Sequence, residues 1–275
     1  MKIALVTGTS TGIGLETAVL AEQAGYTVVA TMRDTGKAGP LRERLPGADV
    51  RRLDVTDPDS VADCVAAVIA DHGQLDALIN NAGAGHVGTI ELESVDAVRD
   101  VMEVNFFGVV QVTKAALPHL RAARGRLITV TSVGGVIGQP FNEAYCAAKF
   151  AVEGWMESLA PVVGRLGVAV SVIEPGAVAT EFVSNIRAGS DLEALVAEAG
   201  DYRPLIGAYL DRTATSFSAA QSAHACAQVV VAALTADEPR FRYQTSEQAA
   251  AFTGVKLADA DGSALQKLTT AWLGE

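Results

Sequence analysis

The feature that most constrains the fold is a glycine-rich loop between a strand and a helix near the start of the chain. Lys2–Thr7 is a short apolar run typical of a buried strand, and residues 7–14 read Thr-Gly-Thr-Ser-Thr-Gly-Ile-Gly. Residues 15–24 have helical periodicity, and residues 26–31 predict a second strand. Glycines at the start of a helix let the backbone approach a pyrophosphate, which the helix N-terminus attracts. No Gly-Lys-Ser/Thr follows, so the loop predicts a dinucleotide site and not a P-loop.

The alternation of strand and helix continues along the chain. Strands are predicted at 48–53, 75–79, 126–131, 168–173 and 240–245, and helices at 58–71, 142–165 and 223–234, with one or two further helices at 95–120. Residues 35–46 predict a loop or short helix, and Pro118 predicts a late kink or break in its helix. This pattern indicates an α/β fold, a Rossmann-type doubly wound and mostly parallel sheet with helices on both faces.

Two segments depart from this rhythm. Residues 184–221 are a mixture of small, acidic and aromatic residues after the sixth strand, a position from which they can cover a substrate. We therefore predict a substrate lid there. Residues 247–275 predict a partly helical tail with a turn at 259–263. With no repeat and no linker, the whole chain, 1–275, is predicted to be one domain.

Composition excludes several classes of function. The 275-residue chain has a net charge of −11, which disfavours nonspecific binding to nucleic acid or to an anionic membrane. Cys64, Cys146 and Cys226 are few, odd in number and far apart, so a reducing compartment is predicted and no disulfide framework or zinc site. No apolar run reaches the ~20 residues of a membrane helix, and no charged-then-apolar leader precedes the first strand. We expect a cytoplasmic protein without a metal site.

Residues 132–149 carry a hydroxyl, a phenol and an ammonium in one order. Ser132 ends a strand, and Tyr145 and Lys149 lie on one face of a predicted helix, one turn apart. A phenol titrates near pH ~10, and a nearby ammonium lowers that pKa. Tyr145 is thus predicted to exchange a proton with an alcohol oxygen that Ser132 also binds. Taken alone, the pair is weak evidence, because a packed tyrosine and a surface lysine on an ordinary helix have the same spacing. Cys146, with no histidine nearby in sequence, is not predicted to be a nucleophile.

The end of the second strand bears on cofactor choice. NAD sites usually place an acid there for the ribose hydroxyl, whereas here Arg33 precedes the first acid, Asp34. Arg33 is predicted to bind a 2′-phosphate, with Thr11 adding a hydroxyl, so NADP (NADPH) is favoured over NAD. The alternative is a solvated Arg33.

Three other stretches have candidate roles. Asp54 and Val55 follow the third strand, where they can meet an adenine ring, and residues 80–83, Asn-Asn-Ala-Gly, either approach a nucleotide or form a simple turn. Asn105 is an amide within an apolar helical pattern and needs hydrogen-bond partners. It is a candidate to hold a water that links Lys149 to solvent.

With the glycine loop, Asn80-Asn81-Ala82-Gly83, Asn105, Ser132, Tyr145-x-x-x-Lys149 and Pro175-Gly176 in order, the chain resembles the short-chain dehydrogenase/reductase family over about residues 2–183. The resemblance implies a seven-stranded sheet and hydride transfer between NAD(P) and a carbonyl or alcohol. It implies that Tyr145 is the acid/base, that Lys149 lowers its pKa and holds the nicotinamide ribose, that Ser132 orients the substrate oxygen and that Asn105 supports a proton relay. The predicted cofactor-binding residues are Gly8, Thr9, Ser10, Thr11, Gly12, Ile13, Gly14, Arg33, Asp54, Val55, Asn81, Ala82, Gly83, Tyr145, Lys149, Pro175, Gly176, Val178 and Thr180.

A narrower likeness lies around the predicted catalytic helix and in the tail. Residues 138–160 and 242–263 are similar to the estradiol 17-beta-dehydrogenase and retinol dehydrogenase branch, which implies NADP and an apolar or aromatic ketone or alcohol, steroid- or retinoid-like. Where the steroid enzyme places a histidine for its substrate, a rough alignment gives Arg212, which opens the possibility of an acidic substrate. The family likeness also implies a homodimer or homotetramer formed through helices 95–120 and 142–165.

Two other readings of the same motifs stay open. One is a regulator that senses a dinucleotide without chemistry, although Ser132, Tyr145, Lys149 and Asn105 are all present. The other is an epimerase or dehydratase of the same fold, a branch with a longer C-terminal substrate domain.

Overall fold

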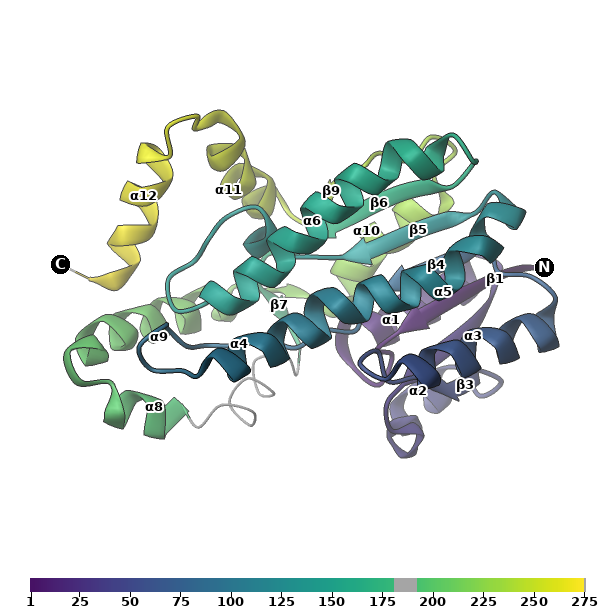
Figure 1. Ribbon diagram of the computed structural model, residues 1–275, viewed down its shortest axis with the longest axis horizontal. Helices are drawn as coiled ribbons and strands as arrows, with labels where there is room; N and C mark the ends of the chain where they lie inside the picture. Colours follow the sequence, from purple (N-terminus) through teal and green to yellow (C-terminus); the bar gives the residue numbers. More distant parts are fainter. Residues whose placement is uncertain (181–191, 275) are drawn as a thin grey trace.

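A computed structural model of the chain describes residues 1–180 and 192–274 (Figure 1). At its centre is a seven-stranded sheet in the order β3-β2-β1-β4-β5-β6-β9, in which every neighbouring pair is parallel. The strands are β1 (Lys2–Thr7), β2 (Tyr26–Met32), β3 (Asp49–Arg52), β4 (Ala77–Asn80), β5 (Arg126–Val130), β6 (Ala169–Glu174) and β9 (Arg242–Gln244). This confirms the predicted Rossmann-type sheet. The strand order reverses between β1 and β4, which opens a crevice at the carboxyl ends of these strands.

Both faces of the sheet are buried, which is why its strands are apolar runs without polar alternation. In β1, Ala4 and Val6 point into one hydrophobic cluster, and Ile3 and Leu5 point into the other. The first cluster is closed by α1 (Gly12–Gln23), α2 (Gly39–Arg44) and α10 (Ala223–Thr235). The second is closed by α3 (Pro58–His72), α5 (Gly108–Ala123) and α6 (Glu143–Gly164), with α5 and α6 in front of the sheet in Figure 1.

The segment 95–120, predicted as one or two helices, is interrupted at Asn105. It consists of α4 (Val95–Met102), a π-helical turn (Glu103–Phe107) and α5. Asn105 is fully buried in this turn, and its Nδ2 donates to the Val101 carbonyl at 3.0 Å and to the Ala84 carbonyl at 2.9 Å. The hydrogen bond from the Asn105 side chain to a carbonyl of the preceding turn thus occurs where the helix has π geometry.

Of the kink or break predicted at Pro118, the break does not occur. Helix α5 continues through Pro118 to Ala123 and ends at Arg124, whose φ is 51°. Proline removes one backbone hydrogen bond. The turn is held by tertiary packing, since Ala116 and Leu120 on either side of Pro118 are fully buried.

The chain after β6 builds the region beside the sheet edge. A small second sheet, which the sequence did not predict, pairs β7 (Val178–Ala179) with β8 (Gln221–Ser222). The described part of the predicted lid consists of α8 (Leu192–Glu198) and α9 (Arg203–Ser218), and residues 181–191 lie outside the described residues. The tail forms α11 (Glu247–Ala258), α12 (Ser263–Thr270) and a 3-10 turn (Ala271–Leu273), so its predicted partial helicity is confirmed.

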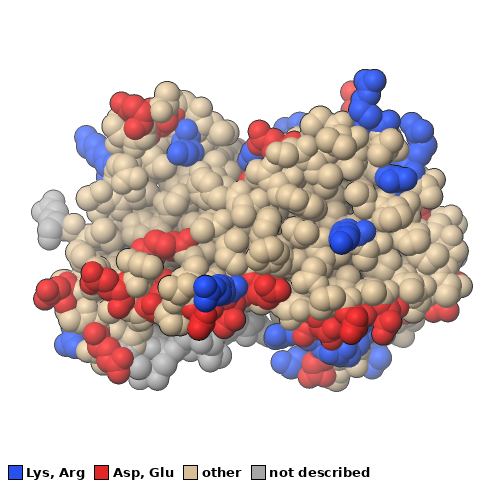
Figure 2. All heavy atoms as spheres, in the orientation of Figure 1, with Lys and Arg blue, Asp and Glu red and all other residues tan. Residues whose placement is uncertain are grey.

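The predictions about disulfides, membrane helices and metal sites can be compared with the described residues. Cys64, Cys146 and Cys226 are buried and form no disulfide, and burial raises the thiol pKa to about 11, about 11 and about 12 respectively. In the described part of the chain, no helix has the length and apolarity to cross a bilayer. The described His, Cys, Asp and Glu side chains form no group of three suited to a metal ion. Figure 2 shows acidic side chains along the lower part of one face, where α3 and α4 lie in Figure 1.

Candidate active site

A cleft of about 1880 Å³ opens at the carboxyl ends of the central strands. Among its lining residues are the glycine loop, the ends of β2 and β4, the catalytic candidates and parts of the lid and the tail. Of the residues predicted for the site, Thr9 and Asn105 do not line the cleft, and all others do. Positions spread over more than 170 residues of sequence therefore meet at one place, as the topology of a doubly wound sheet requires.

The glycine loop forms a cradle with the properties of a pyrophosphate site. Gly8 and Gly12 have positive φ values of 71° and 59°, and residues that carry a side chain rarely adopt such backbone angles. A Cβ on Gly14 would lie 2.2 Å from the Gly8 carbonyl oxygen, so α1 packs against the loop only with glycine there. Thr11 begins α1 without a side-chain cap, and the first turn has no acid. The N–H groups of that turn are thus available to an anion, and the residues fit a dinucleotide.

Buried hydrogen bonds hold this loop against its neighbours. Thr9 is fully buried, and its N–H and Oγ1 donate to the Thr31 carbonyl at 3.0 and 3.1 Å. Asn81 Nδ2 donates to the carbonyls of Thr7 and Gly8 at 2.9 and 3.0 Å. Thr9 thus faces the sheet and not the cleft, while Asn81 joins the loop to the end of β4 and also lines the cleft.

The end of β2 forms the adenosine end of the cleft. Arg33 is exposed there and lies close enough to Asp54 to act on its charge. Burial raises the pKa of Asp54, but hydrogen bonds from Thr56 and the charge of Arg33 outweigh it, so the pKa is lowered. Lys37 lines the same wall and was not predicted as a site residue. Its position in the polar segment shortly after Arg33 is the feature of the sequence that could have indicated it.

Ser132 and Tyr145 meet at the middle of the cleft. Ser132 begins a 3-10 turn (Val133–Gly135), in which its Oγ accepts the Gly134 N–H at 2.9 Å, and its hydroxyl is hydrogen-bonded to Tyr145. Burial raises the pKa of the Tyr145 phenol above its usual value, and the bond to Ser132 lowers it by less. The predicted lowering by Lys149 is therefore not seen in this structure, because desolvation dominates. The raised pKa keeps the phenol protonated at neutral pH.

Lys149 lies behind the phenol, one turn further along α6. Its side chain is 4% exposed, and Nζ donates to the Val130 carbonyl at 3.3 Å and lies 5.8 Å from the centre of the Tyr145 ring. Burial lowers the pKa of Lys149 to about 8, although the Glu153 charge raises it. A Cβ on Gly83 would lie 3.4 Å from Lys149 Nζ and 2.9 Å from Asn105 Oδ1. The buried amide of Asn105 thus supports the cleft wall at Lys149 from behind.

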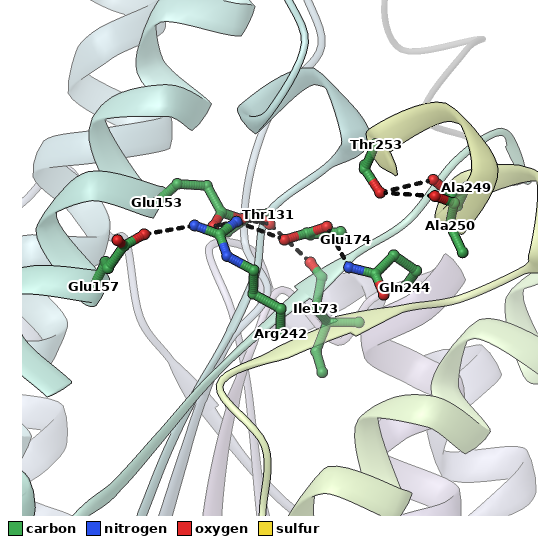
Figure 3. A network of polar contacts seen from close by, with 10 residues as sticks. All are labelled: Thr131, Glu153, Glu157, Ile173, Glu174, Arg242, Gln244, Ala249, Ala250 and Thr253. Atoms are coloured by element: carbon green, nitrogen blue, oxygen red, sulfur yellow. Dashed lines mark hydrogen bonds and ion pairs between the residues drawn. The ribbon is translucent and has the colours of Figure 1, made fainter. Parts of the chain in front are cut away.

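An ionic network around two buried carboxylates lies further along the same face of α6 and was missed from the sequence (Figure 3). Arg242 on β9 pairs with Glu153 at 2.7 Å, with Glu174 at 2.8 Å and with Glu157 at 2.6 Å. Glu153 also accepts a hydrogen bond from Thr131 at 2.5 Å. Two of the partners adjoin the site in sequence, since Thr131 precedes Ser132 and Glu174 precedes Pro175. The only sequence signal was Glu153, four residues after Lys149 on the same helix face.

The lid and the tail form the wall of the cleft beyond Tyr145. On α9, the lining residues Tyr209, Arg212, Thr213, Ser216 and Phe217 recur at helical spacing on one face. The tail contributes Phe252, Leu268 and Trp272, which the sequence did not mark as site residues. Asn142 joins the walls, because its Nδ2 donates to the hydroxyl of Tyr209. The sequence indicated the three tail residues only weakly, since apolar residues in a helical tail usually form part of the hydrophobic core.

Comparison with known proteins agrees with this geometry. The sequence model of the short chain dehydrogenase family matches residues 2–191. The chain is 37% identical to retinol dehydrogenase 8 of Homo sapiens, over 98% of this chain and 89% of that protein. It is 39% identical to 17-beta-hydroxysteroid dehydrogenase type 1 of Homo sapiens, over 95% of this chain and 82% of that protein.

A solved structure shows the same fold. A short chain dehydrogenase/reductase from Burkholderia phymatum, in complex with NAD, is 26% identical and superposes with a TM-score of 0.80 over 94% of this chain and 93% of that one. The family model, the two full-length relatives and the site geometry lead to one conclusion, which confirms the resemblance seen in the sequence. The protein is a member of the short chain dehydrogenase family.

Proposed function

We propose that the protein is an NADP(H)-dependent oxidoreductase that transfers hydride between a nicotinamide and a carbonyl or secondary alcohol. The observation that carries the proposal is the convergence of Ser132, Tyr145 and Lys149 in one cleft with an uncapped, glycine-lined helix N-terminus. An apolar or aromatic ketone or alcohol, steroid- or retinoid-like, suits the lining by Phe217, Phe252 and Trp272. The names of the retinol and steroid dehydrogenase relatives support this substrate class.

The residues divide the work as follows. The dinucleotide, when bound, supplies or accepts the hydride. Ser132 donates a hydrogen bond to the carbonyl oxygen and fixes its position next to the Tyr145 hydroxyl. Because burial keeps Tyr145 protonated, the phenol transfers its proton to that oxygen as the carbonyl is reduced. The Lys149 ammonium, buried one turn away, stabilises the phenolate that remains, and in the reverse direction the phenolate accepts the alcohol proton.

Charge at the adenosine end supports NADP as the cofactor. Arg33 and Lys37 both line the cleft there, together with the hydroxyl of Thr11. A 2′-phosphate brings two negative charges, which a guanidinium and an ammonium bind well. NAD, the ligand of the Burkholderia phymatum relative, is the alternative cofactor.

We also propose that the chain acts as one cytoplasmic domain and assembles as a homodimer or homotetramer. Three buried cysteines without disulfides suit a reducing compartment. Val95, Phe107 and Phe150 are large apolar residues that are 57%, 46% and 39% exposed on α4, the π turn and α6. Such exposure on neighbouring helices is typical of a subunit interface. Sedimentation velocity of the wild-type protein measures the assembly directly, and a monomer at micromolar concentration contradicts it.

Substitution of Tyr145 tests the proposed chemistry. Tyr145→Phe should lower kcat for ketone reduction at least about 10³-fold, because the proton donor is lost, while the dissociation constant for NADPH stays within about twofold. Tyr26→Phe is the matched control, since it removes the hydroxyl of a buried tyrosine outside the cleft. Undiminished turnover in Tyr145→Phe rules out the proposed role. Cofactor binding by the wild type with no turnover across ketones and alcohols would instead indicate a dinucleotide sensor.

A further inference from the structure

The charged groups of the cleft are sorted by sign along its length. At the substrate end, the described charged lining residues are Arg203 and Arg212, both cationic. The acids among the described lining residues, Asp34 and Asp54, lie at the opposite end beside Arg33. In a chain of net charge −11, a substrate wall whose described residues include cations and no acid departs from the average surface. Its field favours a substrate that carries negative charge.

Arg203 and Arg212 differ in the hydrogen bonds that their guanidinium groups make. Arg203 Nε donates to the Val196 carbonyl at 3.2 Å, and its Nη2 donates to the Ala197 carbonyl, so it caps the end of α8. Arg212 makes no ion pair or hydrogen bond with any residue within 1–180 and 195–274. Its guanidinium carbon lies 4.4 Å above the centre of the Trp272 ring. Stacking leaves the edge of the guanidinium, with its N–H donors, open to an acceptor.

The stack gives Arg212 a defined place in the wall. Trp272 stacks in turn on Phe252, with ring centres 5.7 Å apart and an angle of 29° between the rings. The guanidinium of the lid is therefore placed against the tail, and this contact orders the long side chain before a ligand arrives. The buried Nε1 of Trp272, a hydrogen-bond donor, has no partner among the described residues. The described part of the wall therefore offers no acceptor to this donor.

We propose that the substrate is an apolar oxo or hydroxy compound with a carboxylate remote from its reacting carbon, and that Arg212 binds this carboxylate. The inference rests on the proposed function and adds the substrate class. The reacting oxygen lies at Ser132 and Tyr145, the apolar body lies against Phe217, Phe252 and Trp272, and the carboxylate meets the edge of the guanidinium. A planar guanidinium binds a carboxylate through two parallel hydrogen bonds, which positions as well as attracts.

Matched acids and esters test this assignment. The probes are 4-acetylbenzoate and 4′-acetylbiphenyl-4-carboxylate, each with its methyl ester, which share one ketone and differ in charge and in reach. For the wild type with NADPH, kcat/KM should be at least about tenfold higher for one of the acids than for its ester. In Arg212→Gln this ratio should fall to near 1, mainly through KM, and Arg212→Lys should keep part of it. Arg165→Gln removes an exposed arginine that does not line the cleft and should leave the ratio unchanged.

The outcomes separate the inference from the function on which it rests. If Arg212 only clamps the lid to the tail, Arg212→Gln lowers kcat/KM for acid and ester alike, and the unchanged ratio overturns the inference. Equal rates for acid and ester in the wild type overturn it too, while reduction of both leaves the proposed oxidoreductase intact. Isothermal titration of the enzyme–NADP complex with each acid and ester gives a readout without turnover. Acid-selective binding that depends on Arg212, with no reduction, supports the anion site and contradicts the proposed function.

Discussion

Arg242 on the last strand of the sheet lies 2.7 Å from the buried carboxylate of Glu153, which is on the helix that carries Tyr145 and Lys149. The same guanidinium pairs with Glu174, which is fully buried at the end of β6 (Figure 3). A late segment of the chain thus holds the catalytic helix and the strand next to it in one position. The consequences are testable for stability as well as for catalysis.

Removal of Arg242 should destabilise the fold strongly. Arg242→Met leaves the carboxylates of Glu153 and Glu174 buried without their cation, and such a loss costs about 3 kcal/mol of unfolding free energy. Urea denaturation measures the difference. The matched control is Arg52→Met, because its pair with Asp57 is 3.9 Å long and both side chains are largely exposed, so about 0.5 kcal/mol or less is expected. Equal small effects for both variants would show that the network contributes little.

The pH dependence of stability should depend on Glu153. Burial raises the pKa of its carboxyl from 4.5 to about 7, although the Thr131 hydrogen bond lowers it. The folded state therefore binds the proton more tightly than the unfolded state, and the resulting stability is present below pH 4.5 and lost as the pH rises through about 7.

Glu153→Gln removes this titration and isolates its contribution. The unfolding free energy of the wild type, minus that of the variant, should fall from pH 4.5 to about 7 and stay level outside that window. Glu157→Gln is the control, because it removes a largely exposed carboxylate from the same arginine. A difference that stays constant between pH 4 and 8 contradicts a buried titration at Glu153.

Arg33 should determine the preference for NADPH. Arg33→Met removes the proposed phosphate ligand and should weaken NADPH binding about tenfold, or about 1.4 kcal/mol, while the affinity for NADH stays the same. Fluorescence titration at fixed salt measures both constants. Arg42→Met removes an exposed arginine on α2 that does not line the cleft, and it controls for the overall loss of charge. Equal loss for both dinucleotides would identify Arg33 as a solvated charge.

Gly83 should be required for the geometry around Lys149. In Gly83→Ala, the new methyl group would lie 2.9 Å from Asn105 Oδ1. Hydrogen bonds to Val101 and Ala84 hold that amide, so the strain should move the cleft wall and lower kcat about tenfold. Gly254→Ala, on an exposed face of α11 with open space around it, should instead raise stability by about 0.5–1 kcal/mol without affecting kcat. Unchanged kcat in Gly83→Ala would show that the wall is free to relax.

Much of the fold could be predicted from local sequence. The parallel strands are short and buried on both faces, so β1, β5 and β6 appear as apolar runs whose limits agree with the structure to within a residue or so. The glycine loop and the Tyr145–Lys149 pair could also be identified, because positive φ and helical spacing are local properties. The continuity of α5 through Pro118 and the unpredicted π turn at Asn105 depend on packing and on hydrogen bonds to distant residues, such as that between Asn105 and Ala84.

The amino-acid sequence by itself determined the sheet, the dinucleotide loop and the order of the catalytic groups, because each follows from residue types at fixed local spacing. Only the tertiary structure decided which side chains share an environment. It buries Tyr145 and so raises a phenol pKa that the nearby lysine was expected to lower. It also joins Arg242 to Glu153 across 89 residues and stacks Arg212 on Trp272. Burial and long-range contact set these energies, and neither is a function of spacing along the chain.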